Sequence, residues 1–388
     1  MIYLDYAATT PMRKEVLHAF QEAAKKYYGN PSSLHDIGTE ANEALELCRE
    51  QLAGTIQGNK DGVYFTSGGS ESNILAIRSL IEANRKKGNH LITTDAEHSS
   101  VHNLFKQLEE EGYEVTYLSV DGGGQIDLAD FQNALRKDTI LASIHHGNSE
   151  IGAVQPILEI GKILKEHQII FHTDCVQSYG KVPIDVNQNY IDSLSVSSHK
   201  IYGPKGIGMC YINPRVNWKS QYKGTTHEKG FRPGTVDVPS ILAFTAAAQM
   251  MHQEMEGQRR RDLHLRMKLV NGLKELSNQF VVEGNDDMDK QLPHIVGLSF
   301  LQAQGQYIML ECNRYGLAVS TGSACQVGQQ SPSRTMLSMG KTVDDAKQLI
   351  RISFGKMTTE EQITQTIQTI GKVLKTLQKI NLSQLNWL

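Results

Sequence analysis

An apolar run over residues 191–196 is followed at once by the polar stretch Ser-Ser-His-Lys-Ile-Tyr-Gly-Pro-Lys-Gly. The run predicts a buried strand, so the polar stretch places Lys200 at a strand end, where the ligands of open α/β sheets bind. A lysine with hydroxyl and imidazole neighbours, here Ser197 and His199, can form a Schiff base with an aldehyde cofactor. A solvated lysine before an ordinary turn is the alternative, and the choice depends on residues elsewhere in the chain.

A second strand-like run, 169–173, ends in Asp174. Pyridoxal 5′-phosphate works as an electron sink only while its ring nitrogen stays protonated, and a carboxylate held against that nitrogen maintains this state. Asp174 is therefore the predicted partner of the ring nitrogen, and Gln177 the predicted partner of the ring hydroxyl. An aspartate that caps a helix is an equally good interpretation of Asp174 taken alone.

A predicted strand that begins at residue 63 is followed by a turn of small residues, including Gly69 and Ser70, and by a stretch, 74–81, with helical apolar spacing. Free N–H groups and the positive end of the helix dipole at such a turn bind anions. The turn lacks the glycine spacing of a dinucleotide site and the lysine of a P-loop, which favours a phosphate monoester. A plain helix capped by Ser70 or Ser72 is the alternative.

One of the 14 histidines, His98, follows a predicted strand over 90–94 and precedes a predicted helix. A planar imidazole at that place can stack on a planar cofactor. Most histidines do nothing of this kind, so the interpretation of His98 depends on Lys200, Asp174 and the predicted phosphate turn.

Together these motifs make the chain resemble the cysteine desulfurases, in the class V branch of the fold type I pyridoxal phosphate enzymes. The resemblance extends nearly end to end and includes the stretches 3–11, 29–33, 232–235, 320–325 and 350–355. It implies an α/β fold, with a mostly parallel seven-stranded sheet covered by helices in a large domain and a smaller C-terminal α/β domain. The implied division is an N-terminal segment, 1–15, that packs on the small domain, a large cofactor-binding domain, 16–255, and a small domain, 256–388, with the catalytic cysteine loop.

Cys325 is the residue that decides the reaction. It precedes a polar stretch, 326–333, whose glycine and proline predict a mobile loop, and this loop resembles the longer form found in the family. A thiol on such a loop can reach a substrate sulfur, and its reactive form is the thiolate. Cys175 is a possible rival, although a strand end against the cofactor leaves it no room to swing. The remaining cysteines are interpreted as small buried hydrophobes: Cys48, Cys210 and Cys312.

The resemblance implies a pyridoxal phosphate enzyme that converts L-cysteine to L-alanine and holds the sulfur on Cys325 as a persulfide. A sulfur-acceptor protein, in iron–sulfur cluster assembly or thiolation, would then receive that sulfur. The implied catalytic residues are Lys200, Cys325 and His98, and the implied contacts to the substrate are Arg351 and Asn30. No metal site is expected.

Three departures from the family pattern accompany these expectations. Ser149 stands where the family has the asparagine that bonds the ring oxygen of the cofactor, so we expect this shorter side chain to take that role. Gly69 and Ser70 stand where alanine and threonine are usual, and Thr225-Thr226 interrupts a glycine run. The resemblance also implies a homodimer in which Thr235 reaches the phosphate bound in the partner subunit.

The composition agrees with a large enzyme. At 388 residues, 39% hydrophobic and 21% charged, the chain is long enough for two domains. Its net charge of −3 argues against nucleic acid or an anionic membrane as the main partner. Five cysteines without a Cys-x-x-Cys motif indicate a reducing compartment, and neither a signal peptide nor a membrane-spanning run is evident. We therefore expect a cytoplasmic protein.

Other activities remain open on the same scaffold. A selenocysteine lyase or a cysteine-sulfinate enzyme is the nearest alternative, and it would differ in which substrate yields alanine. Another class V aminotransferase would have no need of a loop thiol. A non-catalytic scaffold of a sulfur pathway would bind partners without turnover.

Overall fold

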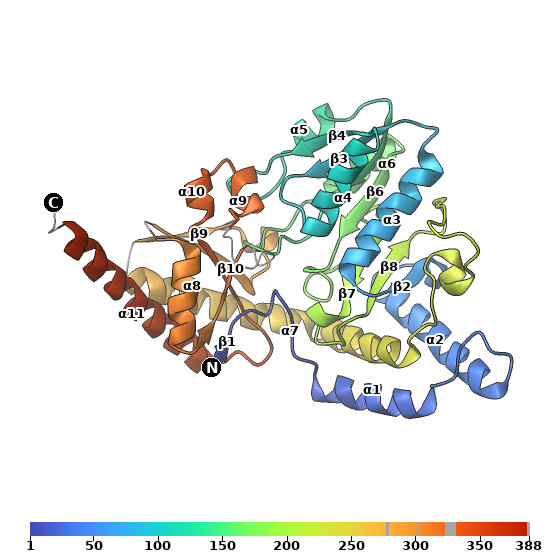
Figure 1. Cartoon of the computed structure of the whole chain (residues 1–388), viewed down its shortest axis with the longest axis horizontal. Helices are drawn as coiled ribbons and strands as arrows, with labels where there is room; N and C mark the ends of the chain where they lie inside the picture. The colour runs from blue at the N-terminus through green and yellow to red at the C-terminus, as the bar shows by residue number, and fades with distance from the viewer. Residues whose placement is uncertain (277–278, 302, 323–330, 386–388) are drawn as a thin grey trace.

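The structure, a computed structural model, describes residues 1–276, 279–301, 303–322 and 331–385 (Figure 1). Its largest sheet has seven strands in the order β2-β8-β7-β6-β5-β3-β4. β8 runs antiparallel to both of its neighbours, and the other neighbouring pairs are parallel. The strands are β2 Val63–Thr66, β3 His90–Thr94, β4 Glu114–Leu118, β5 Thr139–Ser143, β6 Ile170–Asp174, β7 Ser193–Ser197 and β8 Gly208–Ile212. The predicted mostly parallel seven-stranded sheet is confirmed.

Helices cover both faces of this sheet because its central strands are apolar on both sides. Leu91 of β3 packs in one cluster with α3 and α4, whereas the next residue, Ile92, packs in another with α2, α6 and α7. Successive side chains of a strand point to opposite faces, which explains the two clusters. Six of the described α-helices precede β6 in the chain: α1 Lys14–Lys26, α2 Asp36–Gly54, α3 Gly69–Asn84, α4 Ser99–Glu110, α5 Leu128–Asn133 and α6 Ile157–Glu166.

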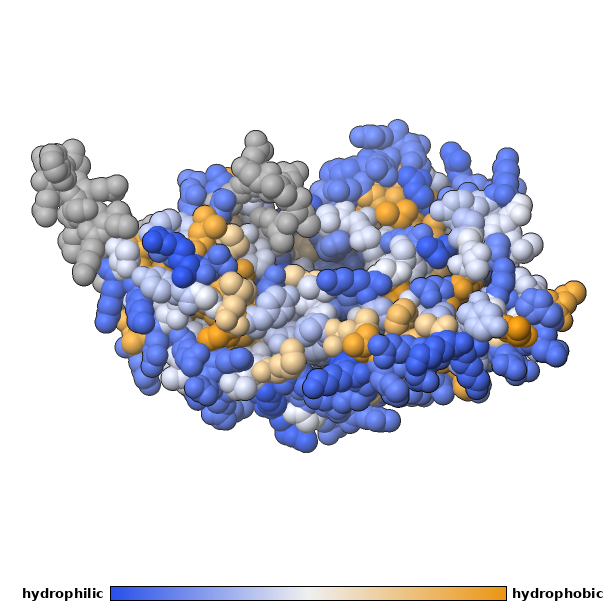
Figure 2. Space-filling view, turned by 60° about the horizontal axis from the view of Figure 1, so that its bottom comes forward, coloured by the Kyte–Doolittle hydropathy of each residue, from blue (hydrophilic) through white to orange (hydrophobic). Residues whose placement is uncertain are grey.

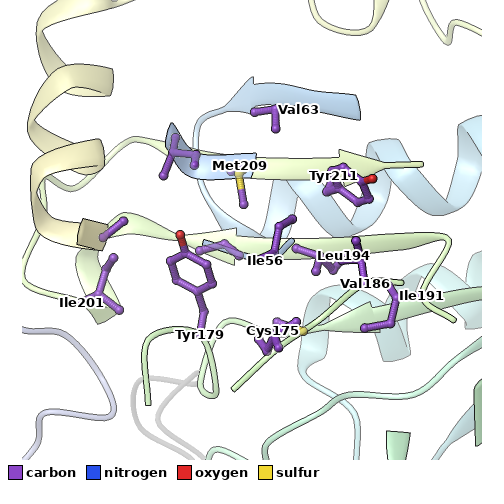
Figure 3. Close-up of a cluster of buried hydrophobic side chains, with 14 of the residues drawn as sticks. Ile56, Val63, Cys175, Tyr179, Val186, Ile191, Leu194, Ile201, Met209 and Tyr211 are labelled. Carbon is purple, nitrogen blue, oxygen red and sulfur yellow. The ribbon is translucent and has the colours of Figure 1, made fainter. Parts of the chain in front are cut away.

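The cluster on the α2 side is close-packed up to the edge of the sheet. Figure 3 shows Ile56 among side chains of β7 and β8, including Leu194, Met209 and Tyr211. Cys175, directly after β6, lies in the same cluster and is fully buried.

A second, four-stranded antiparallel sheet has the order β12-β13-β10-β9. Its strands are β9 Phe280–Glu283, β10 Ile295–Phe300, β12 Ser320–Thr321 and β13 Leu349–Ser353. The helices of this region are α8 Gly305–Arg314, α9 Arg334–Ser338, α10 Val343–Ala346 and α11 Glu360–Leu385. Short 3-10 turns occur at Lys60–Gly62, Ser198–Lys200, His227–Gly230 and Met288–Lys290. The four-stranded sheet has a hydrophobic core of its own.

One helix, α7 Val238–Leu276, runs through both regions over 39 residues (Figure 1). Its first half contributes Ile241 and Phe244 to the core of the seven-stranded sheet, and its second half contributes Leu265 and Leu269 to the core of the four-stranded sheet. The boundary predicted between residues 255 and 256 falls inside this continuous helix, and the division into domains stays a prediction.

The first ten residues connect the two regions, and we call residues 2–10 the N-terminal strap. Its strand β1 Ile2–Tyr3 pairs in parallel with β11 Leu317–Ala318. Further along, Asp5 forms a bridge with Ser353 of β13, and the Thr10 N–H donates to the carbonyl of His199 at 3.0 Å. The strap therefore passes from the four-stranded sheet to the turn that follows β7.

Hydrophilic residues predominate on the face shown in Figure 2, where hydrophobic residues form only small scattered groups. Among the described residues, no helix is both long enough and apolar enough to span a membrane.

Candidate active site

A cavity of about 310 Å³ lies where the C-terminal ends of β6 and β7 meet the N-terminal strap and β13. The carboxyl edge of parallel strands is where open α/β sheets bind ligands. The cavity brings together these predicted residues: Gly69, Ser70, His98, Ser149, Asp174, Gln177, Ser197, His199, Lys200 and Arg351. Residues separated by almost 300 positions in the sequence thus share one small volume.

The N-terminus of α3 forms an anion cradle at one end of the cavity. Its N-cap residue is Gly68, with a φ of 149°, and no side chain caps the helix. A Cβ on the next residue, Gly69, would lie 2.5 Å from Cγ2 of Val176, just beyond β6, so any larger residue here requires that side chain to shift. The alternative of a serine cap is wrong, because the Ser72 hydroxyl instead pairs with Thr66 Oγ1 at 2.7 Å. The uncapped N–H groups fit a phosphate.

Asp174 is buried at the end of β6 and is fixed by two donors. The Val176 N–H donates to its Oδ1 at 2.9 Å, and Asn73 Nδ2 donates to its Oδ2 at 2.7 Å. The oxygen of the Asn73 amide lies 3.2 Å from Nε2 of His172, whose pKa burial lowers to about 4. Sequence reasoning missed Asn73. Its spacing of four residues from Gly69, on the same helix, is the signal that could have placed it in the site.

Lys200 ends the 3-10 turn that follows β7. Its ammonium donates to the carbonyls of Ala7 and Ala8, at 2.5 and 2.8 Å. The neighbouring imidazole of His199 lies 3.1 Å from Thr9 Oγ1, and burial, together with the charge of Lys200, lowers its pKa to about 4. His199 is therefore neutral beside a cationic lysine that the strap holds in the cavity.

Gln177 offers an acceptor to a ligand. Its Nε2 donates to the Ala7 carbonyl at 3.0 Å, whereas its Oε1 is buried and has no hydrogen-bond partner among the described residues. A buried unpaired acceptor is costly, and a ligand hydroxyl in the cavity would satisfy it. This is the role predicted for Gln177.

His98 is the N-cap residue of α4, and its Nδ1 accepts from the Ser100 N–H at 3.2 Å. Its ring is open to the cavity. Desolvation within the site lowers the pKa of His98; the charge of Asp174 opposes this shift, and the charge of Lys200 adds to it. A neutral, fixed ring at the mouth of the cavity suits stacking on a planar ligand.

A buried Glu97–His145 pair, which sequence reasoning also missed, lies next to His98: Glu97 directly precedes it in the sequence, and His145 lines the cavity. Glu97 Oε1 accepts from the His145 backbone N–H at 2.7 Å and lies 3.0 Å from its Nδ1. Burial alone would lower the pKa of His145, but the charge and hydrogen bond of Glu97, together with the charges of Asp174 and Glu150, more than offset burial, and the net shift is upward. No local motif marks this pair, because its members lie on different loops.

Arg351 projects from β13 into the cavity and is 5% exposed. Its Nη2 donates to Asp5 Oδ1 of the strap at 2.7 Å, and its Nη1 donates to the backbone carbonyl of Ser149 at 2.8 Å. Asp5 is a fourth residue that the sequence reasoning missed, although it lies inside the stretch 3–11 that carried the resemblance. The predicted substrate arginine thus has a carboxylate partner within the protein.

Three predicted residues are not placed in the cavity of their own chain. Cys325 lies outside the described residues, although Gly322, just before it, lines the cavity. Asn30 and Thr235 are exposed and do not line the cavity.

The described cysteines are all buried, with thiols that resist ionisation. Burial raises the pKa of Cys48 to about 11, and those of Cys175 and Cys312 to about 12; it also raises the pKa of Cys210. The rival nucleophile, Cys175, therefore lacks both exposure and thiolate character.

The sequence and the fold of this chain are both similar to those of known proteins. The aminotransferase class-V family model matches residues 2–366. A NifS-type protein of Bacillus subtilis (strain 168) is 48% identical over 95% of this chain and 93% of its own length, and the cysteine desulfurase IscS of Dictyoglomus turgidum is 39% identical over 100% and 98%. A solved NifS-like protein superposes with a TM-score of 0.90 at 31% identity, over 97% of this chain and 99% of that one.

The chain therefore belongs to the aminotransferase class-V family. Within it, the chain is similar over its full length to cysteine desulfurases of the NifS and IscS type, which confirms the resemblance and the class of enzyme predicted from the sequence. The residues of the cavity fit the cofactor of that family: a primary amine, a fixed carboxylate, an uncapped helix N-terminus and an open imidazole.

Proposed function

We propose that this chain converts L-cysteine to L-alanine, with pyridoxal 5′-phosphate attached to Lys200 and the sulfur transferred to Cys325. The observation that carries the proposal is the shared cavity, in which Asp174 ends β6, Lys200 ends the turn after the adjacent strand β7, and the uncapped N-terminus of α3 lies beside them. The bound cofactor would supply an electron sink for the electrons released at the substrate Cα.

Each of the other steps is assigned to particular residues of the cavity. The carboxylate of Asp174, fixed by two donors, keeps a ring nitrogen protonated. His98 covers one face of the ligand, and the α3 N-terminus with Ser70, Ser197 and His199 holds the phosphate. Arg351 binds the substrate carboxylate through two parallel hydrogen bonds. Lys200 takes and returns the proton at Cα.

The sulfur step balances without a further reactant. The Cys325 thiolate attacks the substrate sulfur, so that a sulfur–sulfur bond forms while the substrate carbon–sulfur bond breaks. The carbon keeps the electron pair of the broken bond and takes a proton to become the methyl group of alanine. One thiol and one cysteine thus yield one persulfide and one alanine, and a sulfur-acceptor protein removes the persulfide sulfur.

The partner subunit supplies Thr235 in this proposal. An exposed threonine outside the cavity of its own chain is free to reach the phosphate site of a second copy, as the resemblance implies. Sedimentation would give a dimer; an active monomer at micromolar concentration would exclude the shared site. The cytoplasmic location expected from the cysteine content remains part of the proposal.

Replacement of the loop thiol tests the function directly. Cys325→Ser should keep the visible absorption of the bound cofactor, because the thiol has no part in holding it, while alanine production from cysteine falls to near background. Wild-type protein treated with cysteine and then alkylated should carry one additional sulfur atom on the peptide that contains Cys325.

The matched control is Cys175→Ala, which removes the buried rival and should turn over cysteine normally. Additional sulfur on the peptide with Cys175, or wild-type turnover by Cys325→Ser, would show that the nucleophile has been assigned wrongly.

A further inference from the structure

The guanidinium of Arg351 is paired inside the protein before any ligand arrives. Asp5 Oδ1 accepts from its Nη2 at 2.7 Å, and the Ser149 carbonyl accepts from its Nη1 at 2.8 Å. The arginine side chain is 6% exposed and that of Asp5 is 22% exposed. A charge-assisted hydrogen bond in such a shielded place restricts the orientation of the guanidinium plane.

Asp5 is itself held in place independently of Arg351. Its backbone forms a bridge with Ser353, and its carbonyl accepts from the Tyr3 hydroxyl at 3.0 Å. Two residues later, the Ala7 N–H donates to Ser353 Oγ at 2.9 Å. The strap therefore presents the Asp5 carboxylate from a fixed backbone, and the arginine follows the acid rather than the reverse.

Enough donors remain on Arg351 for a ligand. A guanidinium has five N–H groups, and the contacts to Asp5 and Ser149 use two of them. Nε is buried and has no partner among the described residues. Since Arg351 lines the cavity, the remaining N–H groups of a plane already oriented by the protein can bind a carboxylate.

The charge of Asp5 has a second effect. L-cysteine and L-alanine carry the same α-carboxylate, so an uncompensated buried arginine would hold the product as firmly as the substrate. Such uniform binding lowers KM without raising kcat. A carboxylate 2.7 Å from the guanidinium offsets much of its charge at the place where the product must leave.

We propose that Asp5 is a positioning residue that orients Arg351 for the α-carboxylate of the amino acid and, by offsetting its charge, weakens retention of the product. The inference rests on the proposed role of Arg351 in binding substrate. Asp5 touches neither substrate nor cofactor and acts only through the arginine.

Two variants of the cofactor-loaded enzyme separate orientation from charge. Asp5→Asn keeps an oxygen acceptor for Arg351 and removes the charge, whereas Asp5→Ala removes both. The measurements are kcat and KM for L-cysteine, and the Kd of L-alanine from the change in the visible absorption of the bound cofactor.

In Asp5→Asn we expect L-alanine to bind about tenfold more tightly than in the wild type, with a lower KM and a lower kcat, because an opposing charge is gone. In Asp5→Ala we expect alanine to bind about tenfold more weakly than in Asp5→Asn, because the guanidinium is no longer oriented. Ser353→Ala removes the hydrogen bond from the Ala7 N–H but keeps the backbone bridge to Asp5 and the ion pair with Arg351, so it should leave the alanine Kd unchanged.

Arg351→Lys separates the proposed role of Arg351 in binding substrate from the proposed role of Asp5. If this variant leaves KM and the alanine Kd unchanged, the proposed role of Arg351 fails. Two results would overturn the inference about Asp5. In the first, Arg351→Lys raises both the KM for cysteine and the alanine Kd, while Asp5→Asn matches the wild type. In the second, Ser353→Ala reproduces the effect of Asp5→Asn, which would mean that Asp5 only attaches the strap to the sheet.

Discussion

The two walls of the cavity are assembled from different ranges of the chain. The cofactor wall, defined by Asp174, Lys200, His98 and the N-terminus of α3, comes from four segments that each lie at or follow a strand end of one sheet. The substrate wall, defined by Asp5, Ser149 and Arg351, joins the N-terminal strap to β13, and its main ion pair links residues 346 positions apart. Local motifs specify the first wall, and only the completed tertiary structure specifies the second.

This difference predicts which measurement each wall controls. Changes in the cofactor wall should alter the visible absorption and the retention of cofactor. Changes in the substrate wall should alter KM and product binding while the absorption of the bound cofactor stays the same. Four predictions follow, in order of decreasing expected effect; three of them test this division, and the one for Glu97 concerns the stability of the folded protein.

Replacement of the lysine should have the largest effect. In Lys200→Ala we expect alanine production to fall by about 10³-fold or more, because the group that moves the Cα proton is lost. The cofactor should still bind, though weakly and without a covalent bond, since other residues hold its phosphate and ring. Borohydride treatment followed by mass measurement detects the bond, and the exposed Lys162→Ala is the control. Normal alanine production in Lys200→Ala would end the pyridoxal hypothesis.

Replacement of Asn73 should weaken cofactor binding without changing substrate binding. Its Nδ2 supplies one of the two described hydrogen bonds to Asp174, at 2.7 Å. In Asn73→Ala we expect the cofactor Kd to rise about tenfold, the worth of one hydrogen bond to a charged group, with the KM for cysteine close to that of the wild type. Titration of the apoprotein with cofactor gives the Kd. A change confined to KM would contradict the division between the walls.

The Glu97–His145 pair predicts a dependence of stability on pH. Because the folded-state pKa of His145 is raised above its ordinary value of 6.5, the pair contributes stability that is fully present below pH 6.5 and is lost as the pH rises through the folded pKa. Glu97→Gln should therefore lower the free energy of unfolding by about 1–2 kcal/mol in acid and by less in alkali. Denaturant titrations below pH 6.5 and above the folded-state pKa of His145 measure the difference. A loss of stability in Glu97→Gln that grows with pH would contradict the prediction.

The smallest effect is expected at Ser149, where the two walls meet. Its backbone carbonyl serves Arg351 and would be kept in any variant, so Ser149→Ala tests the side chain alone. We expect a loss of about 1 kcal/mol or less in cofactor binding, and Ser149→Asn should be neutral or improve retention. A large loss of activity at unchanged cofactor affinity would place the hydroxyl in the chemistry instead.

Local sequence was sufficient to place the residues of the cofactor wall, because each of them ends an apolar strand or follows one by three or four residues. Asp174 directly ends β6, and Lys200 follows Ser197, the last residue of β7, by three. Strand and turn chemistry are short-range properties, and parallel packing then brings the strand ends together. The number of strands in the sheet, seven, was instead an implication of the family resemblance.

The residues that were missed have partners far away in the sequence. Asp5 was part of a quoted stretch, but nothing near it shows that its carboxylate would meet Arg351. Glu97 and His145 lie on two loops, 48 positions apart, and form a pair only once the sheet is complete. A side chain whose role comes from a distant partner leaves no periodicity or spacing to detect in a single sequence.

The N-terminal strap has a consequence for how the protein is made. Residues 2–10 are synthesised long before the strands that receive them, at 317–318 and 349–353. Until those strands are made the strap of the nascent chain cannot dock on them, and contacts between segments so far apart in the sequence form slowly. A chain that stops before β13 can complete the large sheet but not the cavity, so the cavity is completed only once β13 has been made.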